Sequence, residues 1–422
     1  MTLSTSSSDM RINHSDPNDP RRVKERRKIA LWTILFGGSA LLAGLLVVIF
    51  AVSQLREAFP NPFSLQRIET SANALDSALR LPPDSDDTVV YVFGSSLIEF
   101  GFSPEIFDQR LSSKGIHTRS YNFGYGNADP IIHERFARRF EQIYKDTTGT
   151  VDLVIFEFSP FQATTTRAVQ TGQLNHAAHA ILGDWRDFIE VAKTDHEEAI
   201  ALFNTRYIRN GVPAEAVTNL LATPLRNMQR IQSEANDNDA EPMGDMGWDL
   251  YHMLMSEWPQ AHPPGGWYVE NRGGLPPSAS PKAMALAAEV MAKMQHPSRM
   301  EASRQQRLAC CDMEDLNIDP AMLQHFIGAI KHAQKVAKRV DLLLMPRNQD
   351  IIHLSALGKA NLKDALATIQ HETGVNLVDL SIEPYFSVTD FFDADHLTLF
   401  KGRQKLSELL ADVYAENGDV VK

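Results

Sequence analysis

The chain has 422 residues and a formal net charge of -12, which argues against the basic surface of a nucleic-acid-binding protein. Hydrophobic residues make up 43% of the sequence and charged residues 22%, values typical of a globular protein that can bury a sizeable core. The two cysteines, Cys310 and Cys311, are adjacent. Because adjacent cysteines close a strained ring if they pair, we expect no disulfide framework and interpret them as packing or incidental residues.

The N-terminal part predicts a membrane anchor. Residues 1–28 form a polar tail that ends in six basic residues and one acid between positions 21 and 28. Residues 29–55 carry no charge and exceed the ~20 residues that span a bilayer. Since basic flanks stay cytoplasmic, we expect a single-pass protein of the inner (cytoplasmic) membrane whose main domain is periplasmic or extracellular. A cleaved signal peptide is the alternative, but this apolar run is too long for its hydrophobic region.

Beyond a proline-containing juxtamembrane linker at 56–87, the pattern predicts one α/β domain over residues 88–420. Apolar runs alternate with helical patterns, which favours a parallel sheet with right-handed crossovers. Five such runs read as buried strands, at 89–93, 119–124, 151–158, 340–345 and 375–380. The architecture that we expect is therefore a five-stranded parallel sheet covered by helices.

A helical insertion at about 160–320 interrupts this alternation. It contains long helical patterns through about 172–235, an acidic loop at 234–241 and a Gly- and Pro-rich stretch at 262–277. That stretch is either a loop near the functional site or a surface excursion. His176 and His179 lie one helical turn apart, but neither they nor His353 have an evident third ligand. We therefore expect no metal and no cofactor.

Two short motifs at opposite ends of the domain carry the chemistry. Gly94-Ser95-Ser96 follows the first strand, where open α/β sheets place their ligands. These serines either supply a nucleophile or cap the next helix, since Ser is a favoured N-cap. Near the C-terminus lie Asp393 and His396, three residues apart. A histidine held by a carboxylate can take a proton from a serine, although the spacing alone does not show that these residues meet.

Together Gly94-Ser95-Ser96, Asn122-Phe123-Gly124 and Asp393-x-x-His396 resemble the motifs of the SGNH/GDSL hydrolase superfamily. Within it the chain is similar to membrane-anchored acyl-transfer members, such as the teichoic acid D-alanyl transfer protein and the alginate O-acetylation proteins. The resemblance covers about 88–165 and 320–415 and implies a flavodoxin-like SGNH fold. It also implies that Ser96 is the nucleophile, with Ser95 as the fallback. His396 is then the general base and acid, and Asp393 orients it, with Asp395 as the competing carboxylate.

The resemblance implies an oxyanion hole that this chain matches less well. Gly124 fits the turn-forming glycine of the second motif, whereas the family's donor glycine falls on Asn127. The asparagine of the third motif is absent after the third strand. Asn348, after the fourth strand, is either the substitute donor or a turn residue. Each such donor is typically worth ~10²–10³ in rate.

These residues and the resemblance imply a serine acyltransferase that O-acetylates a secreted or cell-envelope polysaccharide. They also imply a multi-pass membrane O-acyltransferase as the partner that brings the acyl group across the membrane. An esterase that deacylates envelope glycans is one alternative. A non-catalytic assembly or scaffold protein is the other, and the missing asparagine favours it. Arg347 either binds an anionic substrate group or is a surface residue.

Overall fold

The computed structural model describes residues 20–58, 72, 75, 87–145, 151–170, 178–179, 181–183, 185–208, 280–381, 385–398 and 401–416. Residues 1–19 of the predicted N-terminal tail, most of the linker, the acidic loop, the Gly- and Pro-rich stretch and His176 lie outside the described residues. Within the described part, the alternation of strands and helices agrees with the prediction from the sequence.

The centre of the domain is a five-stranded sheet in the order β2-β1-β3-β4-β5, in which every pairing is parallel. This confirms the predicted α/β class, and the order is consistent with a flavodoxin-like fold. The strands span β1 (Thr88–Gly94), β2 (Thr118–Gly124), β3 (Val151–Glu157), β4 (Ala337–Leu344) and β5 (Asn376–Asp379). All five predicted strands are therefore confirmed within a few residues of their expected ends.

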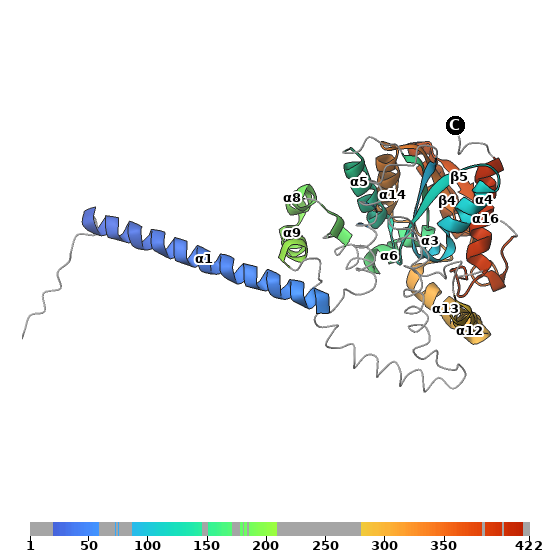
Figure 1. The fold of residues 1–422 in the computed structure, drawn as a ribbon, viewed down its shortest axis with the longest axis horizontal. Helices are drawn as coiled ribbons and strands as arrows, with labels where there is room; N and C mark the ends of the chain where they lie inside the picture. The colour runs from blue at the N-terminus through green and yellow to red at the C-terminus, as the bar shows by residue number, and fades with distance from the viewer. Residues whose placement is uncertain are drawn as a thin grey trace, which may run out of the picture.

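Helices cover both faces of the sheet (Figure 1). One layer packs in a core cluster with β1 residues Tyr91 and Phe93, and consists of α5 (Pro130–Lys145), α14 (Pro320–Ala333) and α15 (Ala356–Thr373). The other packs with Val90 and Val92, and consists of α3 (Ser96–Gly101), α4 (Pro104–Ser112) and α16 (Lys401–Glu416). This alternation follows from the two-residue period of a strand, which sends successive side chains to opposite faces.

The sequence did not predict α15. Its apolar residues are spread among alanines and charged residues, so the helical stripe is weak. The helix begins at a Ser355 cap that accepts from the Gly358 N–H and ends at Gly374, whose φ is 69°. A glycine in this left-handed conformation is a common helix stop.

The predicted insertion has several short helices in its described part. They are η1 (Pro160–Ala163), α6 (Thr165–Gln170), α8 (Trp185–Thr194), α9 (His196–Phe203), η2 (Asn204–Ile208), α12 (Pro281–Met294) and α13 (Pro297–Cys311). A further short helix, η3 (Val388–Asp390), precedes the C-terminal motif.

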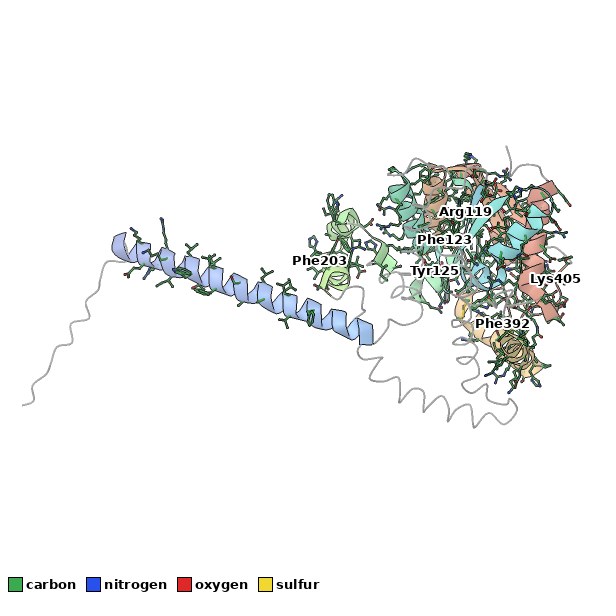
Figure 2. The ribbon with its side chains drawn as sticks, viewed as in Figure 1. Arg119, Phe123, Tyr125, Phe203, Phe392 and Lys405 are labelled. Atoms are coloured by element: carbon green, nitrogen blue, oxygen red, sulfur yellow. A yellow bond between two sulfur atoms is a disulfide. The ribbon has the colours of Figure 1, made fainter. Side chains whose placement is uncertain are left out.

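An aromatic layer runs across the three strands that position the site. The Phe93 ring stacks on Phe123 and on Phe156 with centroid separations of 5.1 Å in each pair. All three side chains are buried, and the labelled Phe123 lies within the domain in Figure 2. Such pairs add to the stabilisation from burial, so the layer holds the carboxyl ends of β1, β2 and β3 in register.

The N-terminal helix α1 (Pro20–Ala58) lies apart from the sheet (Figure 1). Its segment Lys24–Val47 has a mean hydropathy of 2.0 and is 0% buried. Side chains along it project outward without covering protein (Figure 2). Large apolar residues of the helix, such as Ile34 and Leu41, are exposed. By length and composition the helix can cross a membrane. It begins earlier than the predicted apolar segment because the basic residues before it continue the helix.

We expect Gly124→Ala to destabilise the domain by about 1–3 kcal/mol through overpacking. A Cβ at this position lies 2.4 Å from the backbone nitrogen of Glu99, and a backbone atom cannot rotate away. Gly126→Ala is the matched control, because its Cβ meets its nearest neighbour at 3.6 Å. Chemical denaturation of the full chain measures both variants, and equal stability of the two would contradict the tight packing of β2 against α3.

Candidate active site

The nucleophile turn begins where β1 ends at Gly94. Ser95 is the N-cap of α3, since its Oγ accepts from the Leu97 N–H. The same hydroxyl donates to Glu157 Oε1 at 3.0 Å, and the Ser95 backbone N–H donates to Glu157 Oε2. Ser95 is 0% exposed, so its hydroxyl serves the helix cap rather than a substrate. The predicted capping role therefore belongs to Ser95, which leaves the partly exposed Ser96 as the accessible hydroxyl.

A tight turn before α16 presents the C-terminal motif. The Asp393 Oδ1 accepts from the backbone N–H groups of Asp395 and His396, at 2.9 and 2.8 Å. Its Oδ2 lies 2.8 Å from His396 Nδ1. Burial acts to raise the pKa of Asp393, but the charge of His396 holds it well below its ordinary value. Asp393 thus both closes the turn and orients the imidazole.

The structure brings the two motifs together across the domain. His396 Nε2 lies 2.7 Å from Ser96 Oγ, although the residues are 300 positions apart. The rings of Phe392 and Phe100 flank the imidazole, one stacked at 5.4 Å and one edge-on at 5.5 Å. Ser96, His396 and Asp393 therefore have the connected geometry of a nucleophile, a base and an orienting carboxylate.

A second carboxylate shares the histidine. Asp395 Oδ1 lies 3.2 Å from His396 Nδ1 and 3.0 Å from Arg307 Nη2. Burial by itself lowers the pKa of His396, but Asp393 and then Asp395 raise it, to about 10 overall. Asp395 therefore does not replace Asp393 as the residue that orients His396. It adds negative charge at the same nitrogen, and Arg307 compensates part of that charge.

The three residues predicted for the oxyanion hole occupy different positions around the triad. The Gly124 N–H donates to the side chain of Asn122 at 2.8 Å, so the turn itself uses this donor. Asn127 is exposed and has a φ of 63°, and its Oδ1 accepts from Arg167. Asn348 is buried beside the catalytic turn, where its Nδ2 donates to the Asp393 carbonyl at 3.4 Å. Their role as oxyanion donors stays a prediction.

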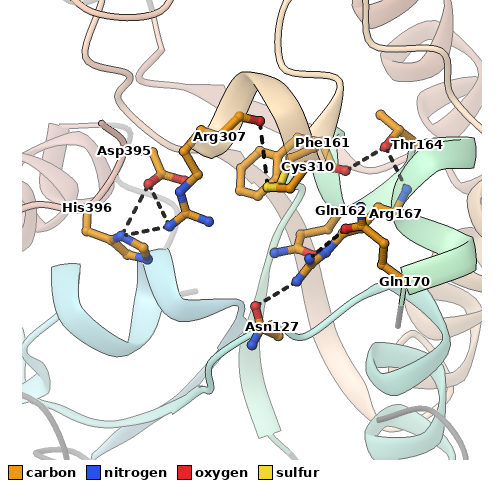
Figure 3. The surroundings of a disulfide bond; sticks show 11 residues. Asn127, Phe161, Gln162, Thr164, Arg167, Gln170, Arg307, Cys310, Asp395 and His396 are labelled. Atoms are coloured by element: carbon orange, nitrogen blue, oxygen red, sulfur yellow. Dashed lines mark hydrogen bonds and ion pairs between the residues drawn. A yellow bond between two sulfur atoms is a disulfide. The ribbon is translucent and has the colours of Figure 1, made fainter. Parts of the chain in front are cut away.

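The helix α13 connects the insertion to the site (Figure 3). It carries Arg307, which reaches Asp395 and His396, and Ser303, whose Oγ accepts from the Ala394 N–H. It ends in a disulfide between Cys310 and Cys311, and the Cys310 Sγ contacts the Arg307 carbonyl. This pairing differs from the expected packing role, but it links adjacent residues and creates no framework between distant segments.

A metal site is the alternative interpretation of the cluster formed by Asp393, Asp395 and His396. Asp393, Asp395 and His396 offer ligand atoms within 4.8 Å of one another. The guanidinium of Arg307 already supplies a positive charge 3.0 Å from Asp395, which disfavours a second cation there. Of the other histidines, His179 is buried and His353 is exposed. That the site works without a metal stays a prediction.

Two residues of the site were missed from the sequence. Glu157 is 0% exposed. Its signal in the sequence is a carboxylate that directly follows the apolar run 153–156 at the end of β3. Burial raises the pKa of Glu157 to about 7 despite the hydrogen bonds from Ser95, which lower it. Arg307 had no comparable signal, because it is one of several arginines on a polar helix.

No protein-family model matches the chain, and no curated protein matches it. The geometry of Ser96, His396 and Asp393 is therefore the main ground for a function.

We expect Asp395→Asn to move the rise of ester cleavage with pH to lower pH, by about 1 unit or more. The base form of His396 takes the serine proton, and the loss of one neighbouring carboxylate lowers the pKa of that histidine. The measurement is kcat/KM against pH with p-nitrophenyl acetate. Asp393→Asn is the comparison, because it also removes the orienting contact and reduces the maximum rate. An unchanged profile in Asp395→Asn would show that Asp395 does not act on His396.

We expect Glu157→Gln to flatten the decline in stability between about pH 4.5 and 7. The folded state holds the Glu157 proton more tightly than the unfolded chain, with a pKa of about 7 against 4.5. The free energy of unfolding therefore falls as pH rises through this window, and glutamine cannot ionise. Denaturation curves of the full chain across this range measure the slope.

The control for this slope is Glu289→Gln, which alters an exposed carboxylate. Asp108, whose pKa burial also raises to about 7, remains in all three proteins. If Glu157→Gln keeps the slope of the unaltered chain, Glu157 is not the buried carboxyl that takes up the proton.

Proposed function

We propose that this chain is a membrane-anchored serine acyltransferase that O-acetylates a secreted or cell-envelope polysaccharide through an acyl-Ser96 intermediate. The observation that carries the proposal is the 2.7 Å contact of His396 Nε2 with Ser96 Oγ, continued by the 2.8 Å contact of His396 Nδ1 with Asp393. The motif resemblance to the SGNH/GDSL hydrolase superfamily supports the same assignment.

In the first half-reaction, Ser96 Oγ attacks the carbonyl carbon of the acyl donor, and His396 Nε2 takes the hydroxyl proton. The bond between the carbonyl carbon and the leaving group then breaks, and His396 returns the proton to that group. Asp393 stabilises the imidazolium that exists between these steps. The product is an ester of Ser96.

In the second half-reaction, a sugar hydroxyl replaces the departed group. Its oxygen attacks the acyl-Ser96 carbonyl while His396 takes the hydroxyl proton. The Ser96 oxygen leaves and recovers that proton from His396, so the enzyme is regenerated and the acyl group is on the glycan. Water as the acceptor would give the esterase reaction with the same residues.

The developing oxyanion needs N–H donors close to Ser96. Ser96 is the first residue of α3, and first-turn N–H groups have no acceptor within their own helix. The backbone N–H of Ser96 is therefore our first donor. The second comes from the Gly126–Asn127 turn, since the Gly124 N–H is already used by Asn122.

The anchor gives the reaction its location. Basic residues precede the apolar part of α1, so we place the N-terminus in the cytoplasm and the sheet domain outside the membrane. A tether confines Ser96 near the bilayer and raises its effective concentration toward a membrane partner. A multi-pass O-acyltransferase that supplies acyl groups across the membrane fits this arrangement.

To test the function, the full chain is compared with Ser96→Ala and His396→Ala. We expect both variants to lose labelling by a fluorophosphonate probe, and the O-acetyl content of the glycan to fall by about 10³-fold or more. Ser113→Ala is the control, because that hydroxyl is exposed and, in the described part of the chain, donates only to the Arg110 carbonyl. It should behave as the unaltered chain.

The other outcomes separate the alternatives. If acetyl groups disappear from the glycan when the active protein is added, the chain is an esterase. If the unaltered chain takes no label and Ser96→Ala leaves glycan acetylation unchanged, the enzyme reading is wrong and a scaffold role replaces it.

A further inference from the structure

A cavity of about 700 Å³ lies beside α15, at the carboxyl ends of β4 and β5. Its walls come from the segment after β4, from one side of α15 and from the end of β5. None of Ser96, Asp393 and His396 lines it, so it is separate from the triad. Its volume is in the range of small-molecule sites.

The inner surface of the cavity is largely aliphatic. Seven apolar side chains line it: Leu344, Ile352, Leu354, Leu362, Leu366, Ala367 and Leu377. Several of these, such as Leu362 and Leu377, are only partly buried. Apolar surface left open in a concave site favours a ligand that removes it from water.

The charged part of the lining is predominantly cationic. Lys359 and Lys363 lie four residues apart on α15 and are exposed, and among the described residues their ammonium groups have no partner. Like charges at this spacing destabilise a helix. The acid of the lining is Asp379, whose Oδ1 accepts from the backbone and hydroxyl of Ser381. The cavity thus has an excess of positive charge in a chain of net charge -12.

Arg347 provides an independent indication of a missing anion. It also lines the cavity, and its Nη1 and Nη2 atoms are shielded from solvent without a hydrogen-bond partner in the described part of the chain. A buried charged donor without an acceptor is costly. Asp395 acts on the charge of Arg347, but neither Nη1 nor Nη2 has a hydrogen bond in the described part of the chain. An anionic group that enters beside Arg347, Lys359 and Lys363 would supply hydrogen-bond acceptors to these three cations.

We propose that this cavity binds a single-chain anionic amphiphile, an acyl chain that ends in a carboxylate or a phosphate. The acyl chain covers the leucine-rich wall, and the head group lies near Arg347, Lys359 and Lys363. The membrane-spanning length of α1 is consistent with a bilayer as the source of such molecules. The proposal does not depend on acyl transfer at Ser96.

The test uses the full chain in nanodiscs of zwitterionic phosphatidylcholine and a decanoic acid that carries a photoreactive diazirine. We expect the cross-linked peptides to come from residues 344–381. Decanoate or lysophosphatidate should reduce this labelling by competition, whereas decanol should not. Stronger competition by decanoate than by lysophosphatidate identifies a fatty acid as the ligand, and stronger competition by lysophosphatidate identifies a membrane-derived phosphate. Labelling of peptides outside the cavity, or equal competition by decanol, would overturn the proposal.

Paired substitutions test the role of charge. Lys359→Gln together with Lys363→Gln should reduce the labelling of the cavity about tenfold, because two charge-assisted contacts are lost. Lys331→Gln together with Lys338→Gln is the control, since these exposed lysines carry the same charge but do not line the cavity. Equal loss in both pairs would show general charge attraction and contradict a built site.

Discussion

The close approach of α3 to the sheet at Gly94 and Gly124 is the constraint on which the site depends. A Cβ at Gly94 would lie 2.1 Å from Ile98 and 2.6 Å from Glu157, so a side chain there would separate the helix from the strand. Without one, the chain turns at once into α3, and Ser95 reaches Glu157 beneath it. Ser96 is therefore held at the edge of the sheet by the close packing at Gly94 and by the contacts of Ser95 with Glu157.

The charge balance around His396 is the second feature that defines this site. Asp393 and Asp395 both approach Nδ1, while Arg307 contacts Asp395 and the same ring nitrogen. Two carboxylates stabilise the imidazolium more than one does, and so they favour the charged state that follows proton transfer from serine. The same arrangement leaves a smaller fraction of His396 in its unprotonated, base form at neutral pH, because the pKa of His396 is raised to about 10. Arg307 is suited to moderate that conflict through its contact with Asp395.

The contacts of the insertion show that it supports the C-terminal turn of the site. Gln295 donates to the carbonyls of Thr389 and Phe391, and Ser303 accepts from Ala394. The segment 295–307 therefore braces the turn that carries Asp393 and His396, and it supplies Arg307 to the site. At the carboxyl ends of β4 and β5, residues of α15 and β5 line the cationic cavity, where apolar surface and positive charge occur together.

The sequence alone determined those features that depend on residues close together in the chain. Runs such as 89–93 and 151–158 predicted their strands because burial on both faces requires continuous apolar residues, and the uncharged run 29–55 predicted the apolar helix for a similar reason. The candidate residues Ser96, Asp393 and His396 also came from short motifs. Only the tertiary structure decided that Ser95 caps the helix while Ser96 faces His396, that Glu157 lies beneath the turn, and that Arg307 arrives from the insertion. These contacts join residues far apart in the chain, and they depend on strand order and helix packing, which local patterns of polarity do not encode.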